Sequence, residues 1–164
     1  MHLITTGPHA YLLQQTDGSA AGCLFYPEGR PENGRLSSRK EYLIVNDQQG
    51  IWTTREAGDN ETVAISRVRV DGTMVIETRG IQYIFKKPVS WKPRFLLLDP
   101  DNEEAAALLP SVNWAYKAYD FTLQVNEDLP EETDAFIILQ AVHCAICSMW
   151  MLNGSLLPAV GMAP

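Results

Sequence analysis

Short apolar runs alternate with turn-forming residues over most of the chain, and one long apolar segment follows near its end. Runs rich in β-branched and aromatic residues recur from Arg39 onward, each closed by Gly, Pro, Asn or Asp. The runs that predict strands are Glu41–Val45, Gly50–Thr54, Val63–Val70, Met74–Thr78, Ile81–Phe85, Arg94–Leu98 and Tyr119–Asn126. Such closely spaced turns are typical of antiparallel sandwiches and barrels.

Two of these segments carry the clearest local signals. Asp71-Gly72 separates two β-rich runs, and this dipeptide between such runs predicts a hairpin. In the last run, apolar and polar residues alternate without error, so Tyr119, Phe121, Leu123 and Val125 share one face. We expect this strand to be half-buried.

The N-terminal part of the chain has weaker patterns. Ala10–Leu13 and Cys23–Tyr26 flank Asp17-Gly18-Ser19, which predicts a weak hairpin. The segment that follows, residues 27–38, is rich in Pro, Gly, Ser and charge. We expect it to be an exposed loop.

The long apolar segment Ala135–Leu152 contains no formally charged residue. It predicts a helix over residues 129–153, preceded by acidic residues that suit a helix N-terminus and followed by a short tail, 154–164. A helix that is apolar around its whole circumference must be enclosed by protein or by lipid. The sequence therefore predicts a single domain, residues 1–164, of mainly β structure (α+β) wrapped around this helix.

Composition narrows the classes of function. The 164 residues are 46% hydrophobic and carry a formal net charge of −7, which argues against general affinity for nucleic acid. The three cysteines are too few for a disulfide scaffold, so we expect free thiols. The N-terminus lacks the basic and apolar regions of a secretory signal, and we expect a cytoplasmic protein.

The charge is unevenly distributed along the chain. Seven of the 13 basic residues lie within residues 67–94, where the only acids are Asp71 and Glu77. This basic block consists of Arg67, Arg69, Arg79, Lys86, Lys87, Lys92 and Arg94. Exposed strand positions readily take Lys and Arg, so a solvated sheet face explains the block, and an anion-binding face is the alternative.

The order of elements resembles the Tubby C-terminal-like superfamily, which includes the LURP-one-related proteins and the phospholipid scramblases. The residues that carry the resemblance are Tyr83–Lys87, Arg94–Asp99, Tyr119–Leu123 and, above all, Glu131–Leu139. The resemblance implies a closed antiparallel β-barrel with a central, C-terminal hydrophobic α-helix. Members of that superfamily are associated with phosphoinositide binding, lipid scrambling or unknown roles. Because no lipid-site or calcium-binding residues of these families can be aligned here, the resemblance carries neither activity to this chain.

One chemically interesting cluster lies on the predicted helix. Gln140, His143, Cys144 and Cys147 follow the spacing i, i+3, i+4 and i+7, so they share one stripe. Imidazole and thiolate are metal ligands, and two cysteines three apart are also found in redox sites. The alternative is a set of satisfied core residues, because one helix face supplies at most three ligands and no second ligand motif occurs elsewhere.

These observations favour a non-enzymatic binding or interaction module whose ligand is an anionic lipid headgroup or an acidic peptide. We expect no catalytic residues, no cofactor and no metal, and we take the seven residues of the basic block as the contact surface. Two alternatives stay open. The final helix leaves the barrel for the membrane, as in a scramblase-like lipid protein, or the histidine and cysteines of the helix form a metal or redox site.

Overall fold

The computed structural model describes residues 1–116, 118–126 and 131–152. They form twelve antiparallel strands in which every strand pairs with its neighbour in sequence, and one helix. The strands are β1 (His2–Gly7), β2 (Ala10–Gln14), β3 (Ala20–Phe25), β4 (Asn33–Ser37), β5 (Glu41–Gln48), β6 (Ile51–Glu56), β7 (Thr62–Val68), β8 (Met74–Thr78), β9 (Ile81–Lys86), β10 (Phe95–Leu98), β11 (Glu104–Asn113) and β12 (Ala118–Val125). The helix is α1 (Glu131–Leu152).

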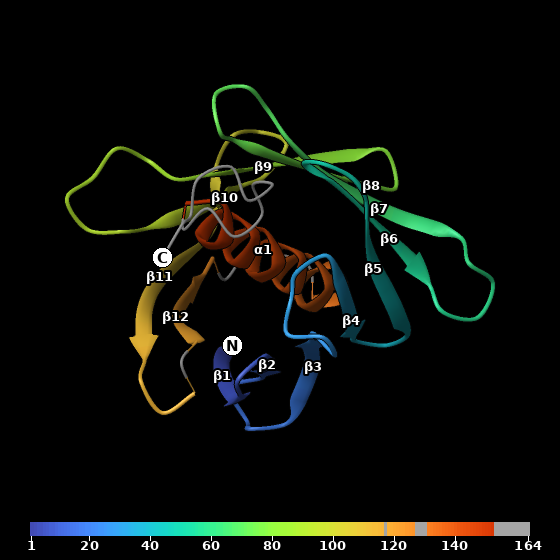
Figure 1. Ribbon diagram of the computed structural model, residues 1–164, viewed down its shortest axis with the longest axis horizontal. Coiled ribbons are helices and arrows are strands. Elements are labelled where there is room, and N and C mark those ends of the chain that lie inside the picture. The colour runs from blue at the N-terminus through green and yellow to red at the C-terminus, as the bar shows by residue number, and fades with distance from the viewer. Residues whose placement is uncertain (117, 127–130, 153–164) are drawn as a thin grey trace, which may run out of the picture.

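The sheet curls into a nearly closed barrel around α1 (Figure 1). This confirms the predicted fold class, mainly antiparallel β structure around a C-terminal helix. The two terminal strands, β1 and β12, lie beside each other, but no hydrogen-bonded ladder joins them among the described residues. The closure expected from the family resemblance is therefore incomplete at this one seam.

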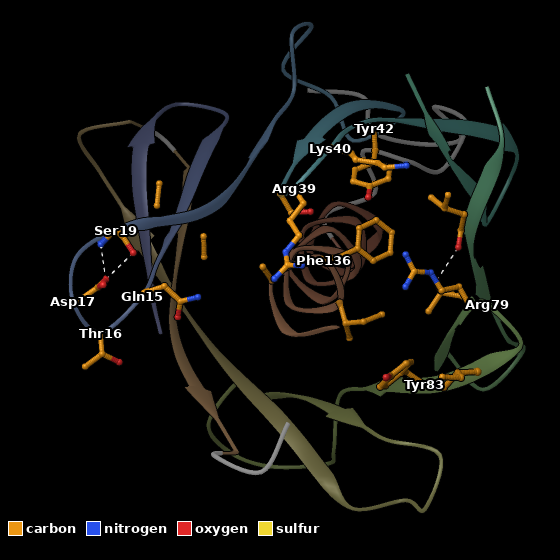
Figure 2. A pocket seen from close by; sticks show the side chains of 18 residues that line it. Gln15, Thr16, Asp17, Ser19, Arg39, Lys40, Tyr42, Arg79, Tyr83 and Phe136 are labelled. Carbon is orange, nitrogen blue, oxygen red and sulfur yellow. Dashed lines mark hydrogen bonds between the residues drawn. The ribbon is translucent and has the colours of Figure 1, made fainter. Parts of the chain in front are cut away.

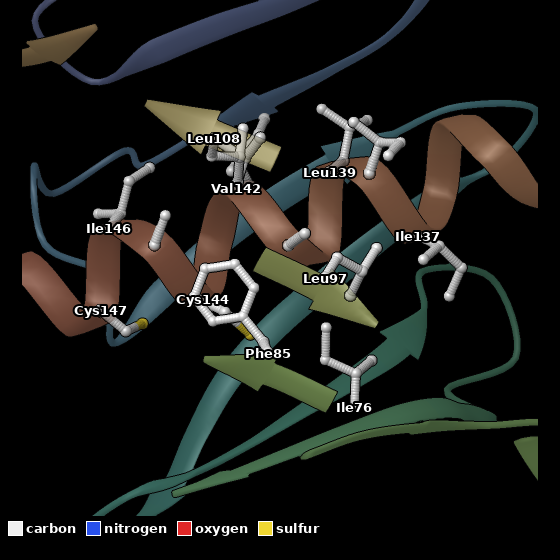
Figure 3. Close-up of a cluster of buried hydrophobic side chains, with 14 of the residues drawn as sticks. Ile76, Phe85, Leu97, Leu108, Ile137, Leu139, Val142, Cys144, Ile146 and Cys147 are labelled. Atoms are coloured by element: carbon white, nitrogen blue, oxygen red, sulfur yellow. The ribbon is translucent and has the colours of Figure 1, made fainter. Parts of the chain in front are cut away.

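The helix is enclosed on all sides, as its uniform apolarity predicts. Every described side chain from Ile137 to Cys147 is buried. Figure 3 shows Leu139, Val142 and Ile146 directed toward Leu108 of β11, while Ile76, Phe85 and Leu97 approach the helix from β8, β9 and β10. Full burial of one such aliphatic side chain stabilises the fold by about 1.5–3 kcal/mol, so the helix is the centre of the core.

Residues 27–38 do not form the exposed loop that the composition predicts, because β4 occupies most of the second half of the segment. Gly34 and Leu36 point inward between the exposed Asn33 and Arg35. A Cβ atom at Gly34 would lie 3.0 Å from Cε1 of Tyr26, so glycine leaves room for that ring. The polar residues of β4 therefore lie on its outer face, while its glycine faces the core.

The predicted strands all appear, with ends shifted by a few residues, and the hairpin at Asp71-Gly72 joins β7 to β8. The weak N-terminal hairpin is also confirmed, since β2 pairs with β3. Besides β4, the strands β1 and β11 are not predicted by the sequence pattern. Residues 129, 130 and 153 of the expected helix and the tail 154–164 lie outside the described residues.

An up-and-down barrel has two ends, and the helix distinguishes them. At the helix-start end lie the turns β2–β3, β4–β5 and β8–β9, beside the first residues of α1. At the helix-finish end lie the β1–β2, β3–β4 and β11–β12 connections, together with the β7–β8 turn and the long β9–β10 loop. The two ends differ in their chemistry.

Candidate functional site

The structure gathers most of the basic block at or near the helix-finish end. Lys86 ends β9, Lys87 and Lys92 lie in the β9–β10 loop, and Arg94 comes directly before β10. Arg69 follows β7 at the same end. Arg79 is the exception, because it lies in the β8–β9 turn at the helix-start end.

Ion pairs engage two residues of the basic block. Nη2 of Arg67 lies 3.2 Å from Oε2 of Glu77, and Nη2 of Arg94 lies 2.5 Å from Oε1 of Glu104. Exposed pairs of this kind contribute little to stability, about 0–1 kcal/mol, but they neutralise charge locally. Lys86, Lys87 and Lys92 have no carboxylate within ion-pair distance among the described residues.

The β9–β10 loop combines these lysines with exposed apolar side chains. Val89 is fully exposed, and Trp91 is 88% exposed although it is one of the largest apolar residues. Nζ of Lys92 lies 4.6 Å from the centre of a Trp91 ring, a cation–π distance. We call Lys86, Lys87, Val89, Trp91 and Lys92 the basic-aromatic loop.

Other loops at the helix-finish end expose further apolar side chains. Trp114 is 84% exposed in the β11–β12 connection, and Tyr116 beside it is also exposed. Val70, in the turn between β7 and β8, is fully exposed. Several neighbouring loops at one end of the barrel therefore present apolar tips to solvent.

Sequence reasoning finds the lysines of this end. For Trp91 and Trp114 it favours packing in the core or at the barrel rim over a rim that contacts a ligand. Trp52 is buried and its Nε1 donates to the carbonyl oxygen of Pro31 at 3.1 Å, whereas Trp91 and Trp114 are exposed. A signal is present, because Pro88 and Pro93 flank Trp91 and keep that segment out of a strand ladder. A large apolar residue between two prolines and two lysines belongs to a loop, where the core cannot cover it.

The stripe on α1 is a buried core cluster in which each polar side chain has a partner, although Oε1 of Gln140 accepts no hydrogen bond among the described residues. The hydroxyl oxygen of Tyr26 lies 2.8 Å from Nδ1 of His143, and Nε2 of Gln140 donates to Oγ1 of Thr54 at 2.8 Å. Sγ of Cys147 lies 3.5 Å from Nε2 of His143. Both polar side chains of the stripe thus find partners in the barrel wall, as the structural interpretation of the sequence predicts.

Burial keeps every member of this cluster neutral. It lowers the pKa of His143 to about 3 and raises the pKa of Cys144 to about 12. Burial also raises the pKa of Cys147 well above its ordinary value. A thiolate is the reactive form of cysteine, so these buried, protonated thiols are poor nucleophiles.

No three His, Cys, Asp or Glu side chains come together as a metal-binding group within residues 1–116, 118–126 and 131–152. The cysteines there are free. No helix of the described chain combines the length and the apolarity that a membrane crossing requires.

The chain matches no model of a protein family, no curated protein and no solved structure in the three comparisons made.

Proposed function

We propose that the protein is a non-enzymatic binding module that docks on anionic membranes through the helix-finish end of its barrel. The observation that carries this proposal is the basic-aromatic loop, in which exposed Val89 and Trp91 lie between Lys87 and Lys92. The ligand is the surface of a bilayer rather than one headgroup in a closed pocket.

The chemistry of this loop matches the interface of a bilayer. Tryptophan is enriched at the level of lipid headgroups because its ring is apolar and its N–H is polar. Each lysine near an anionic leaflet contributes about 1 kcal/mol of attraction, which decays within a Debye length. A loop that carries both residue types binds a bilayer through apolar burial and through electrostatic attraction at the same contact.

The neighbouring loops extend the contact. Trp114, Tyr116 and Val70 are exposed at the same end of the barrel, and each adds apolar area to a surface that meets lipid. Exposed apolar patches mark interaction surfaces, and these three loops place large apolar residues at the end that we propose meets the bilayer.

The distribution of charge favours an orientation in which the helix-finish end faces an anionic membrane. The whole chain carries a net charge of −7, so an anionic surface repels most of the molecule. Lys86, Lys87 and Lys92 form a local group of cations that such a surface attracts. The barrel therefore approaches an anionic bilayer in one orientation, with the helix-finish end toward the headgroups.

The resemblance to lipid-associated families is consistent with a lipid partner, but it assigns no binding residue to this chain. The exposed residues of the basic-aromatic loop carry the proposal. In our proposal α1 stays inside the barrel and acts only as its core. The loops alone touch the membrane.

Cosedimentation with vesicles tests the proposal. We expect the protein to bind vesicles of phosphatidylcholine and phosphatidylserine at low salt, to bind them weakly at high salt, and not to bind pure phosphatidylcholine. The double variant Lys87→Glu, Lys92→Glu should lose binding by roughly tenfold or more, given about 1 kcal/mol for each lysine.

A matched control separates position from net charge. The double variant Arg35→Glu, Arg55→Glu changes the net charge by the same amount, but Arg35 lies on the outer face of β4 and Arg55 near the helix-start end of β6. We expect it to bind nearly as well as the wild type. Equal loss in both double variants would reduce the effect to net charge and contradict a specific docking end.

A further inference from the structure

A cavity of about 840 Å³ opens at the helix-start end of the barrel, opposite the basic-aromatic loop (Figure 2). Its walls come from the β2–β3, β4–β5 and β8–β9 turns and from the first described side chains of α1. Ligand-binding sites in proteins commonly occupy roughly 300–1,000 Å³ and combine apolar walls with a few polar groups. The proposed function makes no use of this cavity.

Arg79, which lines the cavity, has an unusual backbone conformation. Its φ is 50°, and Gly80 follows with a φ of 76° in the two-residue connection of the β8–β9 hairpin. Among the described residues, the other non-glycine residues with positive φ are Asn60 and Asn102. Asparagine tolerates this region, whereas an arginine there costs about 1–2 kcal/mol.

This backbone conformation places the side chain of Arg79 at the cavity. In Figure 2 the guanidinium groups of Arg79 and Arg39 are directed toward Phe136 from opposite sides of the cavity. Guanidinium groups bind carboxylates and phosphates through paired N–H donors. A hairpin position that favours asparagine thus holds a cation at the cavity.

Two of the other charged groups that line the cavity are already engaged. Nζ of Lys40 lies 2.7 Å from Oε1 of Glu56. The carboxylate of Asp17 accepts hydrogen bonds from the backbone N–H and the hydroxyl of Ser19, at 2.9 and 2.7 Å. Arg79 has no such ion pair among the described residues, so it remains available to a ligand.

Part of the lining is suited to an apolar body. The rings of Tyr42 and Phe136 pack 4.9 Å apart between centroids, and Val63 and Ile81 contribute aliphatic surface. Tyr83 is buried at the base of the same wall. An organic ligand that enters here meets apolar side chains below a cationic rim.

We propose that this cavity binds a small organic anion that has an apolar body. Its carboxylate, phosphate or sulfonate group is held by Arg79, and its body packs against Tyr42 and Phe136. The inference is independent of membrane docking, because the two surfaces lie at opposite ends of the barrel and share no residue.

Two fluorescent probes of almost identical shape test the charge requirement. Anilinonaphthalene sulfonate has an aromatic body and an anionic group, and phenyl-naphthylamine has the same body without the sulfonate. We expect the full-length protein to bind the sulfonate probe more tightly than the neutral one. Failure of the wild-type protein to bind the sulfonate probe would overturn the proposal.

The decisive variant is Arg79→Asn, which removes the cation and introduces a residue that the backbone favours. We expect about tenfold weaker binding of the sulfonate probe, unchanged binding of the neutral probe, and a melting temperature equal to or above that of the wild type. The matched control Arg35→Asn removes a cation from an outer strand face and should change neither affinity. Equal affinity of the sulfonate probe for Arg79→Asn and the wild type would contradict the role of Arg79.

Ala20→Trp locates the probe. Ala20 is an exposed residue that lines the cavity, so a tryptophan there fills space without disturbing the core, and both probes should lose binding. If both probes bind Ala20→Trp as tightly as the wild type, or if Trp91→Ala abolishes their binding instead, the probes occupy another surface and the proposal is wrong.

Discussion

The hydroxyl oxygen of Tyr26 lies 2.8 Å from Nδ1 of His143, which joins the residue after β3 to the middle of the central helix. Both side chains are buried, and Trp52 packs edge-on against the imidazole with a centroid separation of 5.7 Å. This contact fixes the position of the helix along the barrel axis, because a shift of one helical turn would leave the Tyr26 hydroxyl without the His143 imidazole as its partner.

His143 makes stability depend on pH. Burial lowers the pKa of His143 in the folded protein to about 3, against an ordinary value of 6.5. Between these two pH values the unfolded chain binds a proton at this side chain and the folded chain does not. The resulting stabilisation is present above pH 6.5 and is lost as the pH falls. Between pH 7 and pH 5 we expect the free energy of unfolding to fall by about 2 kcal/mol, as measured by urea denaturation.

The control for this prediction is His143→Gln, which accepts the Tyr26 hydrogen bond but does not titrate. The variant should be less stable at pH 7 and should lose much less stability on acidification. The carboxylates with lowered pKa values, Asp17 and Asp71, are held by hydrogen bonds from Ser19 and Thr73 and lose their contribution only at more acidic pH. An equal decline in wild type and variant between pH 7 and pH 5 would contradict the assignment to His143.

Gly22 provides a test of the packing between β3 and the helix. A Cβ atom there would clash with the carbonyl oxygen of Ser37 and lie 2.8 Å from Cδ1 of Leu139. We expect Gly22→Ala to lower the free energy of unfolding by about 1–3 kcal/mol through overpacking. Gly58→Ala is the matched control, since nothing lies within 4 Å of the point that its Cβ atom would occupy, and it should be neutral or slightly stabilising.

The buried thiols should be unreactive in the folded protein. Cys144 and Cys147 are fully buried and have raised pKa values, so neither exposure nor thiolate character favours attack on a disulfide reagent. Titration of the native protein with such a reagent should modify no thiol other than the half-buried Cys23, and Cys23→Ser should abolish the native reaction. Rapid modification of Cys144 or Cys147 without unfolding would reopen the redox interpretation.

The sequence predicts the fold well where patterns are local. The charge-free helix and the alternation along β12 depend on residues close in sequence, and both predictions are confirmed. The pattern misses β11 because Ala105–Ala107 have low strand propensity, yet small side chains suit a strand that packs against the helix. It misses β4 because the glycine of that strand makes room for Tyr26, a contact that only the folded chain reveals.

The candidate sites are less predictable. Counting charge finds the lysines of the basic block, but it groups Arg79 with them although the hairpin register places this residue at the opposite end of the barrel. The exposure of Trp91 and Trp114 depends on which loops project from the barrel. The cavity is formed by turns far apart in sequence, so no local pattern predicts it.

Quenching of tryptophan fluorescence by brominated lipids is the measurement that tests membrane docking most directly. With vesicles that contain phosphatidylserine and brominated acyl chains, we expect quenching of the wild-type protein that falls markedly in Trp91→Phe, while Trp52→Phe leaves the quenched signal in place because Trp52 is buried. Quenching that is absent, or that is unchanged in Trp91→Phe, would show that the basic-aromatic loop does not enter the interface and would contradict the proposed function.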